Sequence, residues 1–515
     1  MKKIICAALS FLMCFSLFST TAFAAKDKTV KTGIKVEEVA NFSIKSSEEV
    51  ALMNTKTPVI AIQDETDAIR FVDINGNRII DELYDDVISP NIKDGNLSDK
   101  ETWQALSEAD IIVVGKAYEE DSYRYGFLDV KGAELVPCQY DDITVFDGRI
   151  CALFKLREDD LKVDDMILID LVSKEPINIE IPEEIYEKAY YSSDIMCNLS
   201  EDGCFQFCAG SRYGSAGEDG FLYVYDPEGK LVFSESGSYD LYLYSELEGY
   251  DYSGFFSFDD ALYNENGKMI TATNAVIQSV GEEQGVIVYY DNGSYGFMDL
   301  EANVICEEVS EFAMEIVGET AIAQKENKYA LVNLDGTALT EFDYDKIELA
   351  ENGIATAIKD GKVGFINSDG EEITDFVFDE ETSYWPFTPY DNCIVVKDEK
   401  YGMIDENGKY IVKPEIEKEN AYINQFTAFI KEDVNGGEEQ SVYMRSGAVV
   451  TAEGIYMTDN PDLVEVYDKK KTALVDYGGN VLVKAGKHSE YIAMSGTNYV
   501  LGIAGKNITV YQLVI

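Results

Sequence analysis

Carboxylates outnumber every other chemically capable side chain in this sequence. The 515 residues include 96 Asp and Glu against 42 Lys and Arg, which gives a formal net charge of −54. Two suitably spaced carboxylates can act as general acid and general base, as in glycoside hydrolysis. No motif singles out such a pair, so the sequence assigns no catalytic residue. An extracellular carboxylate-based hydrolase is therefore the alternative to a non-catalytic protein.

Other catalytic signatures are missing from the sequence. His488 is the only histidine, which excludes an HExxH metal site, and no nucleophile motif accompanies it. We predict that His488 is a surface or loop residue. The glycine-rich stretch at 210–217 has neither the GxSxG spacing of a nucleophile elbow nor the GK[ST] ending of a phosphate loop, so it reads as a flexible loop.

Acidic turns could supply oxygen ligands to calcium, and Asp129, Asp226 and Asp405 are examples. A 12-residue calcium loop needs ligands at alternating positions, whereas these turns have only a leading acid and a closing glycine. We therefore predict a structural role for the turns and no cofactor, with calcium as the weaker alternative.

The stretch 239–263 is rich in tyrosines that alternate with acidic residues and serines. Exposed tyrosines beside carboxylates can stack on sugar faces and hydrogen-bond their hydroxyl groups, which makes this stretch a candidate ligand surface. Aromatic residues are also favoured in strands, where alternation buries one row, and we favour this packing interpretation. The candidate residues are Tyr239, Tyr242, Tyr244, Tyr250 and Tyr252.

The first 24 residues read as a secretory signal peptide. Two lysines precede an apolar run, and Ala22–Phe23–Ala24 has the small-x-small order that signal peptidase cuts. We expect cleavage after Ala24 and a secreted, extracellular protein with no transmembrane segment, because no later stretch approaches the roughly 20 apolar residues that span a bilayer. The acidic charge would repel phosphate backbones, so we expect no nucleic-acid partner.

Seven cysteines lie beyond the predicted cleavage site, and their odd number and wide spacing do not form a disulfide framework. The spacing leaves open one pair among Cys197, Cys204 and Cys208, and buried thiols are expected for the others. The seven are Cys138, Cys151, Cys197, Cys204, Cys208, Cys306 and Cys393.

An Asp or Asn followed three residues later by Gly recurs between apolar, β-prone runs, in the later part of the chain every 32 to 39 residues. The leading side chain can accept hydrogen bonds from backbone amides just ahead, and Gly supplies the positive φ that closes a hairpin. In the better copies an aromatic residue and then Asp follow; we predict that this Asp also hydrogen-bonds a turn. The turn residues assigned as structural include Asp129, Gly132, Asn333, Gly336, Asp405 and Gly408.

Residues 125–152 resemble the WG repeat of bacterial proteins, with Tyr in place of most of the family's Trp. The resemblance covers most of residues 59–510 and fades between 171 and 260. It implies a β-rich repeat protein and no particular activity. The aromatic–Gly pair recurs at Tyr125–Gly126, Tyr295–Gly296 and Tyr401–Gly402.

These repeats predict an all-β fold in which units of about 32 to 40 residues form one or more β-propellers, with an open β-solenoid as the alternative. About ten units exceed the usual four to eight blades, so we expect two propellers, or one propeller with extra units. The N-terminal segment would span 25–57, divergent repeats with two insertions 58–290, and regular repeats 291–515.

The expected function is that of a secreted binding or scaffold module for an extracellular protein, a glycan or a cell-envelope component. We expect the protein to act as a monomer. Repetition of the same acids favours this interpretation over catalysis, because one active site needs only one copy of its residues.

Overall fold

The computed structural model folds into small antiparallel β-sheets that follow one another in chain order. No helix in the described part of the chain is long and apolar enough to cross a membrane. The structure describes residues 30–514 except 54, 89–104, 107, 120–121, 147, 158–162, 183–194, 201–202, 210–219, 238–240, 247–251, 259–260, 273–275, 282–283, 350–352, 385–386, 388–391, 419–420, 424–428, 433–439, 459 and 495–496. The predicted signal peptide and the glycine-rich stretch at 210–217 lie outside these residues.

The described strands form eleven sheets, of which one has eight strands. That sheet consists of two four-stranded meanders joined by a short parallel pairing of β17 with β21, so we describe twelve units. Units 1 to 4 are β2–β4 (Glu49–Leu52, Ile60–Gln63, Ile69–Val72), β5–β8 (Asp86–Ile88, Ile111–Glu119, Ser122–Asp129, Glu134–Tyr140), β9–β12 (Asp142–Phe146, Ile150–Leu156, Val163–Asp170, Glu175–Pro176) and β13–β16 (Ile195–Leu199, Phe205–Ala209, Gly220–Tyr225, Leu231–Gly237).

The middle units are also antiparallel meanders of three or four strands. Units 5 to 8 are β17–β20 (Leu241–Glu246, Tyr252–Phe258, Ala261–Tyr263, Met269–Ala272), β21–β24 (Val276–Gly281, Val286–Asp291, Ser294–Asp299, Val304–Ser310), β25–β27 (Glu315–Val317, Thr320–Lys325, Lys328–Asn333) and β28–β30 (Lys346–Leu349, Ala355–Lys359, Lys362–Ile366). Isolated bridges at Tyr84, Tyr344 and Phe378 add a short outer edge to units 1, 7 and 8.

The last units include the first strand of the chain. Units 9 to 12 are β31–β33 (Asn392–Lys397, Lys400–Asp405, Tyr410–Glu417) with the 3-10 helix η2 (Glu380–Tyr384) before it, β34–β37 (Ala421–Ile423, Phe429–Glu432, Gln440–Tyr443, Val449–Ala452), β38–β41 (Gly454–Met457, Leu463–Asp468, Lys471–Asp476, Val481–His488), and β42–β44 (Glu490–Ala493, Tyr499–Ala504, Asn507–Val514) completed by β1 (Lys35–Ser43).

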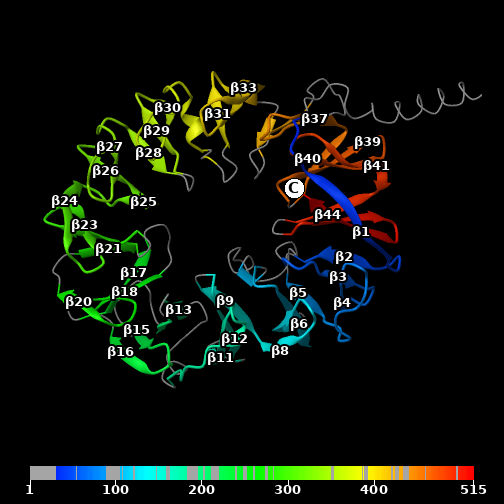
Figure 1. Ribbon diagram of the computed structural model, residues 1–515, viewed down its shortest axis with the longest axis horizontal. Helices are drawn as coiled ribbons and strands as arrows, with labels where there is room; N and C mark the ends of the chain where they lie inside the picture. The colour runs from blue at the N-terminus through cyan, green and yellow to red at the C-terminus, as the bar shows by residue number, and fades with distance from the viewer. Residues whose placement is uncertain are drawn as a thin grey trace, which may run out of the picture.

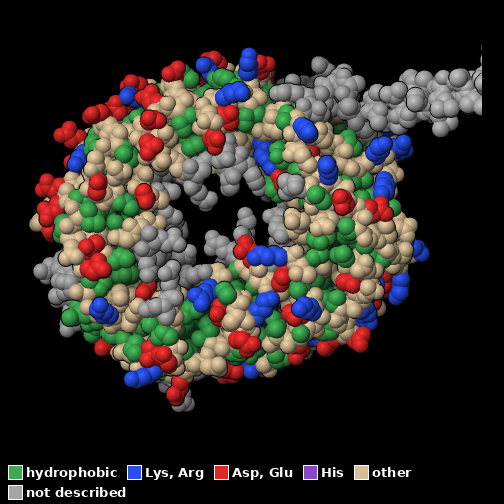
Figure 2. Space-filling model, viewed as in Figure 1, with side chains coloured by type: hydrophobic (Ala, Val, Ile, Leu, Met, Phe, Trp, Pro, Cys, Tyr) green, Lys and Arg blue, Asp and Glu red, His purple; other side chains and the backbone are tan. Residues whose placement is uncertain are grey.

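The units are arranged as a single ring, which is a large β-propeller (Figure 1). In units 1, 2, 4 and 7, for example, the first strand (β2, β5, β13 or β25) lies nearer the centre than the last, and a central opening is visible in Figure 2. The prediction of tandem β-units forming a propeller is confirmed, but the expectation of two rings, or of one ring with extra units, was wrong. All twelve units take part in the same ring because the apolar contacts between neighbours continue without interruption around it.

Those contacts are twelve clusters of buried apolar side chains among the described residues. Eleven of them contain buried side chains of two neighbouring units, and the cluster of unit 9 reaches unit 10 through the partly buried Tyr443. Strand β10 shows how: Ile150, Ala152 and Phe154 pack toward unit 4, whereas Cys151 and Leu153 pack toward unit 2. Successive side chains of a strand point to opposite faces of its sheet. The sheets therefore bury both faces at their inner strands, and strands such as β10 and β31 are buried in nearly continuous apolar runs, whereas outer strands such as β24 and β33 are largely exposed.

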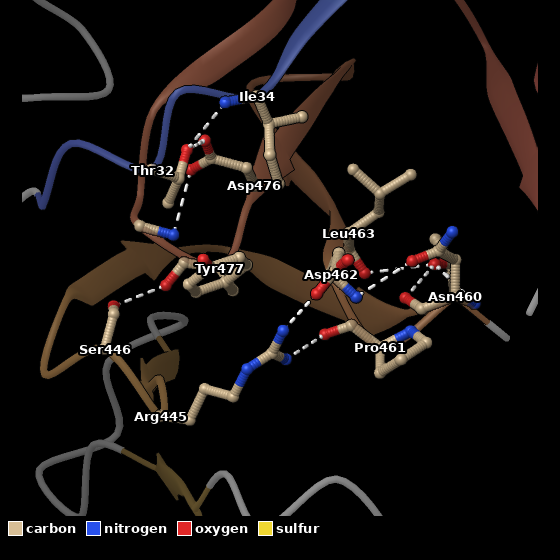
Figure 3. Close-up of polar contacts among 12 residues, drawn as sticks. Thr32, Ile34, Arg445, Ser446, Asn460, Pro461, Asp462, Leu463, Asp476 and Tyr477 are labelled. Atoms are coloured by element: carbon tan, nitrogen blue, oxygen red, sulfur yellow. Dashed lines mark hydrogen bonds and ion pairs between the residues drawn. The ribbon is translucent and has the colours of Figure 1, made fainter. Parts of the chain in front are cut away.

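The two ends of the chain close the ring. Strand β1 pairs antiparallel with β44, from Lys35 opposite Val514 to Ser43 opposite Asn507, and supplies the outermost strand of unit 12. Ahead of β1, the Val30 amide donates to the Gly478 carbonyl over 2.7 Å, and the Thr32 hydroxyl donates to the buried Asp476 carboxylate (Figure 3). Residues 30–43 thus fasten the N-terminus to units 11 and 12.

Glycine closes the repeated Asp–x–x–Gly turns for two reasons, its backbone conformation and its lack of a side chain. The Asp129 carboxylate accepts hydrogen bonds from the amides of Lys131 (2.9 Å) and Ala133 (2.8 Å), while Gly132 adopts φ +86°. A Cβ on Gly132 would also lie 2.3 Å from the Ile79 carbonyl oxygen of the preceding unit. Glycine is needed there both for its backbone conformation and for the close approach of two units.

The glycine of the aromatic–Gly pair has a different function. A Cβ on Gly126 would lie 2.4 Å from the Val136 carbonyl oxygen, because β8 bulges over β7 between Tyr125 and Phe127. The same bulge occurs opposite Gly296 and Gly402. A bulge of this kind bends the outer strand and increases its twist.

Removing the closing strand should open the ring. We expect a chain that begins at residue 45 to melt well below one that begins at residue 30, by on the order of 3 kcal/mol or more in unfolding free energy, because the apolar face of unit 12 and the edge of β44 become exposed. Calorimetry and light scattering would measure this. Equal melting temperatures and equal radii for the two truncations would contradict closure by β1.

Substituting the bulge glycine should destabilise the ring without changing its surface. Gly126→Ala should cost about 1 to 3 kcal/mol, since the added methyl meets backbone that cannot move away cheaply. The matched control is Gly454→Ala, whose Cβ would meet only the Tyr456 side chain at 3.4 Å and should change stability by less than about 0.5 kcal/mol. Thermal melting of the two variants beside the parent tests the difference.

Candidate functional site

The repeated aromatic–Asp pair fastens each unit to the next. The Asp141 carboxylate accepts a 2.9 Å hydrogen bond from the Leu156 amide of unit 3, and pairs with Arg124 of unit 2 over 3.3 Å. At the junction of units 7 and 8, Asp345 does the same with the Asp360 amide and with Lys328. The predicted hydrogen-bonding function of the Asp is confirmed, and the aromatic residue before it is buried.

A pocket of about 690 Å³ lies beside one of these pairs, at the junction of units 2 and 3. It occupies the face of the ring where β7 and β11 begin and where β8 and β10 end. This face is opposite to the Asp–x–x–Gly turns, because those turns join the third strand of a unit to the fourth. The lining residues are Arg124, Gln139, Asp141, Lys155, Leu156, Arg157 and Asp164.

Two cations of this pocket, Arg124 and Lys155, each contact a carboxylate and an aromatic ring. The Arg124 guanidinium lies 4.3 Å from the centre of the Tyr118 ring, in addition to its pair with Asp141. Lys155 pairs with Asp165 over 3.0 Å and lies 5.3 Å from the centre of the Tyr140 ring. The hydrogen bond to Asp165 raises the pKa of Lys155, so this ammonium stays charged at neutral pH.

Sequence reasoning missed these cations. The chain has seven arginines, and three of them, Arg124, Arg149 and Arg157, fall within 34 residues. That cluster in an otherwise acidic chain was the available signal. It remained hidden because the residues belong to two repeats and meet only where adjacent units pack. Figure 2 shows Lys and Arg side chains in this sector of the ring, over β5 to β9.

The predicted tyrosine surface falls mostly outside the described part of the structure. Tyr239 and Tyr250 are not among the described residues. Tyr242 and Tyr244 lie in β17 and Tyr252 lies in β18, but the described part does not include their side chains. Their interpretation as a ligand surface stays a prediction.

The acids considered for calcium accept hydrogen bonds from the backbone of their own turns. One carboxylate oxygen of Asp405 accepts hydrogen bonds from the amides of Asn407 and Lys409, as Asp129 does in its turn, and Asp226 accepts one from Lys230. At the third assigned turn, Gly336 has φ +83° and donates its amide to the Asn333 carbonyl. Among the described residues, no group of three or more His, Cys, Asp and Glu side chains could hold a metal ion.

His488 is buried, which corrects the prediction of a surface or loop position. It ends β41, is 5% exposed, and shares a 2.7 Å hydrogen bond between its Nε2 and the Tyr511 hydroxyl of unit 12. Its ring fills the space over Gly502, where a Cβ would come within 2.7 Å. The ring of Tyr491 packs edge-on against it. The only histidine is thus part of the apolar contact next to the closing strand.

The seven cysteines beyond the predicted cleavage site are buried or half-buried in the sheets. Cys151 lies inside β10, and burial raises the pKa of its thiol well above the ordinary value. Burial also raises the pKa of Cys138, to about 11. A thiol with a raised pKa is a poor nucleophile at neutral pH. The group Cys197, Cys204 and Cys208 is buried in and beside β13 and β14.

Comparison with known proteins finds the WG containing repeat at residues 125–152, 364–401 and 401–422. No curated protein matches the chain. Solved structures that match include Hsv2p of Kluyveromyces lactis, with 12% identity over 48% of this chain and 91% of that one, at a TM-score of 0.25. The β-propeller domain of the Trilobed protease from Pyrococcus furiosus, described as having an open velcro topology, matches with 14% identity over 59% and 94%, at 0.23. A eukaryotic initiation factor matches with 9% identity over 70% and 86%, at 0.30.

The burial of His488 predicts that acid destabilises the ring. Burial, with the nearby Lys487 charge, lowers the pKa of His488 below its ordinary 6.5. The unfolded chain therefore takes up a proton near pH 6.5 that the folded ring accepts only at lower pH, so this contribution to stability is complete above pH 6.5 and is lost as the pH falls. It amounts to about 1.4 kcal/mol for each unit by which the pKa is lowered.

The measurement is the melting temperature at pH 7.5 and at pH 5.5, for the parent and for His488→Gln. Burial also raises the pKa values of the Asp86, Glu315 and Glu465 carboxyl groups, so the informative quantity is the difference between the two proteins. We expect the parent to lose more stability than the variant. An equal or smaller loss in the parent would contradict the assignment.

Proposed function

We propose that this chain, which carries WG-type repeats in a closed propeller ring, is a secreted, non-catalytic binding or scaffold protein for an extracellular protein, glycan or cell-envelope ligand. The observation that carries the proposal is the pocket between units 2 and 3. Its polar side chains form a preset network of ion pairs and hydrogen bonds on a rigid sheet junction. Sites held in this way recognise a ligand at low cost in conformational entropy.

The network favours recognition over hydrolysis. A general acid must carry a proton near neutral pH, and a general base must be free to take one. Asp141 instead accepts a hydrogen bond from the Leu156 amide and pairs with Arg124, so both of its carboxylate oxygens are already engaged within the ring. The other repeat Asp residues, such as Asp345 and Asp379, are engaged in the same way. These carboxylates hold the ring together, and we assign them no catalytic function.

A broad acidic surface would complement the pocket. Asp and Glu side chains are spread over the rim of the ring in Figure 2, and the formal net charge is −54. Such a charge keeps a protein soluble and repels anionic polymers at long range, although salt screens it over about 8 Å at physiological ionic strength. A ligand that is not cationic would then be recognised only at short range, by the pocket. A cationic ligand could also be attracted by the acidic rim.

The test is retention of the purified mature chain on separated envelope fractions of the producing cell, namely wall polysaccharide, membranes and released proteins. We expect retention on one fraction with no soluble product formed from it. Repeating the assay with calcium and then with a chelator shows whether a metal bridge contributes. Release of sugar or peptide products by the pure protein would refute the non-catalytic proposal, and absence of retention on every fraction would refute binding to the envelope.

A further inference from the structure

The junction of units 11 and 12 lacks the acid that fastens other units to each other. Between units 7 and 8, the Asp345 carboxylate pairs with Lys328 over 2.6 Å and accepts a 2.9 Å hydrogen bond from the Asp360 amide. Between units 11 and 12, the same junction position is Ser489. The acids at this position that bind a neighbouring unit in one or both of these ways are Asp85, Asp141, Glu311, Asp345, Asp379, Glu417 and Glu453.

The backbone identifies Ser489 as the equivalent of Asp345. The Ser489 amide donates to the Ile503 carbonyl over 2.7 Å, and the Asp345 amide donates to the Ile358 carbonyl over the same distance. In both units the next residue begins the first strand, opposite that same isoleucine. The acid has therefore been exchanged for serine at an unchanged position of the backbone.

Lys471 is the cation that this exchange leaves without its counterion. It begins β40, as Lys328 begins β27, and in both units the following residue bridges to the residue just before the junction position. Lys328, Lys362 and Lys400 each pair with the junction acid. Lys471 is exposed and pairs with no carboxylate in the part of the chain that the structure describes.

The backbone amide of Gly505 is a second group that faces this position. Gly505 has φ +63° and Asp360 has φ +53°, so the two hairpins begin their turns alike. The Asp360 amide donates to the junction acid, whereas no described residue accepts a hydrogen bond from the Gly505 amide. The Ser489 hydroxyl donates to the Ile503 carbonyl instead, over 3.0 Å. A Cβ on Gly505 would meet nothing within 4 Å, so the position is open to solvent.

Further lysines lie at the two turns beside this position. Lys469 and Lys470 form the tip of the turn in unit 11, and Lys506 follows Gly505 in the turn of unit 12. All three are exposed. Figure 2 shows Lys and Arg side chains gathered over β39 and β41 at the edge of the ring. This is an unusual neighbourhood in a chain with a formal net charge of −54.

The acids of this neighbourhood do not occupy the open position. Glu453 accepts the Lys469 amide over 3.0 Å at the junction before it, and Glu38 pairs with Lys487 over 2.7 Å. Glu490 follows Ser489, but among the described residues it forms no ion pair with Lys471. A carboxylate that fills the position would therefore come from another molecule.

The other junctions show what fits the open position. Asp345 and Glu453 both reach it from their own backbones, so a carboxylate on a short, flexible stem is suitable. Its two oxygens can accept hydrogen bonds from an amide and an ammonium together. A single exposed ion pair contributes little, so a ligand with several carboxylates in a row would also use the flanking lysines. Repulsion from acids elsewhere on the ring is screened over about 8 Å at physiological ionic strength.

We infer that the junction of units 11 and 12 binds an acidic segment of a protein partner, with one Asp or Glu carboxylate between Lys471 and the Gly505 amide. The inference rests on the proposed binding function and names a partner class, at a second junction that is distant from the pocket of units 2 and 3. Neighbouring acids of the segment lie near Lys469, Lys470 and Lys506. No bond is made or broken.

The test is a nuclear magnetic resonance titration of the full mature chain, isotope-labelled at its glycines. The Gly505 amide signal is identified by its loss in Gly505→Asn. The probes are capped tetraaspartate, capped tetraasparagine, inorganic phosphate and tetragalacturonate. We expect tetraaspartate to shift the Gly505 signal and tetraasparagine to leave it unchanged, with the strongest binding for tetraaspartate.

The sharpest variant is Ser489→Asp, which supplies the missing acid from the chain itself. It should raise the melting temperature and weaken tetraaspartate binding by about tenfold or more, because the position is then filled. Lys471→Gln should weaken binding to a similar extent. Ser489→Ala is the matched control, since it leaves the position open and should bind as the parent does. Lys328→Gln, at the junction of units 7 and 8, should also leave binding unchanged.

An unshifted Gly505 signal, or binding that is unaffected by Ser489→Asp, would overturn the inference. Phosphate or tetraasparagine binding as tight as that of tetraaspartate would show that the position does not select carboxylates, and tighter binding of tetragalacturonate would replace the protein segment with an acidic glycan. If tetraaspartate fails to bind while the protein is still retained on an envelope fraction, this partner class is wrong and the binding function stands. Failure of both removes both.

Discussion

Burial of both faces of every small sheet is the constraint on which the rest of this structure depends. A sheet of three or four short strands is marginal by itself, so each unit needs an apolar neighbour on either side. A row of such units would leave two apolar faces uncovered at its ends. The twelve described clusters have no such ends, because Leu52 and Ile60 of unit 1 pack with Leu501 and Val510 of unit 12. Closure of the ring is therefore what completes the core, and strand β1, pairing with the last strand, is the element that secures it.

The same constraint explains why the repeated residues are unavailable for chemistry. Gly132 allows one unit to approach the next, Gly126 allows the outer strand to bulge, and Asp141 links two units through a backbone amide and an arginine. Each of these functions is geometric and recurs around the ring. A ligand site must then come from residues that break the pattern, as Gln139, Leu156 and Arg157 do in the pocket between units 2 and 3, where the junction of units 7 and 8 has Asp343, Asp360 and Gly361. A rigid junction with altered side chains is a simple way to build a binding site on a repeat protein.

The contacts between units also account for where many of the cations lie. Lysines and arginines at the starts of third strands pair with the repeat Asp, as Lys328 and Lys362 do, so many cations are committed to junctions. These pairs are partly exposed, and exposed pairs contribute only about 0 to 1 kcal/mol each. Their importance is in fixing how adjacent units meet. The acids in excess are left on the surface, where they are solvated and where they decide which partners can approach.

The sequence by itself determined the all-β fold and the turns, because these depend on residues a few positions apart. It also predicted from repetition that the repeat Asp forms hydrogen bonds, but the partners, such as the Leu156 amide for Asp141, lie in the next unit. Asp129 and Gly132 define their hairpin whatever surrounds it, since the carboxylate reaches amides two and four residues ahead. Three features were decided only by tertiary structure. The single ring depends on pairing between residues more than 460 positions apart, such as Asn41 and Thr509, and no local pattern specifies such a partner. The burial of His488 depends on Gly502 and Tyr511 of the next unit. The pocket joins residues of two repeats whose side chains converge only when their sheets pack, so its charge could be counted from the sequence but not located.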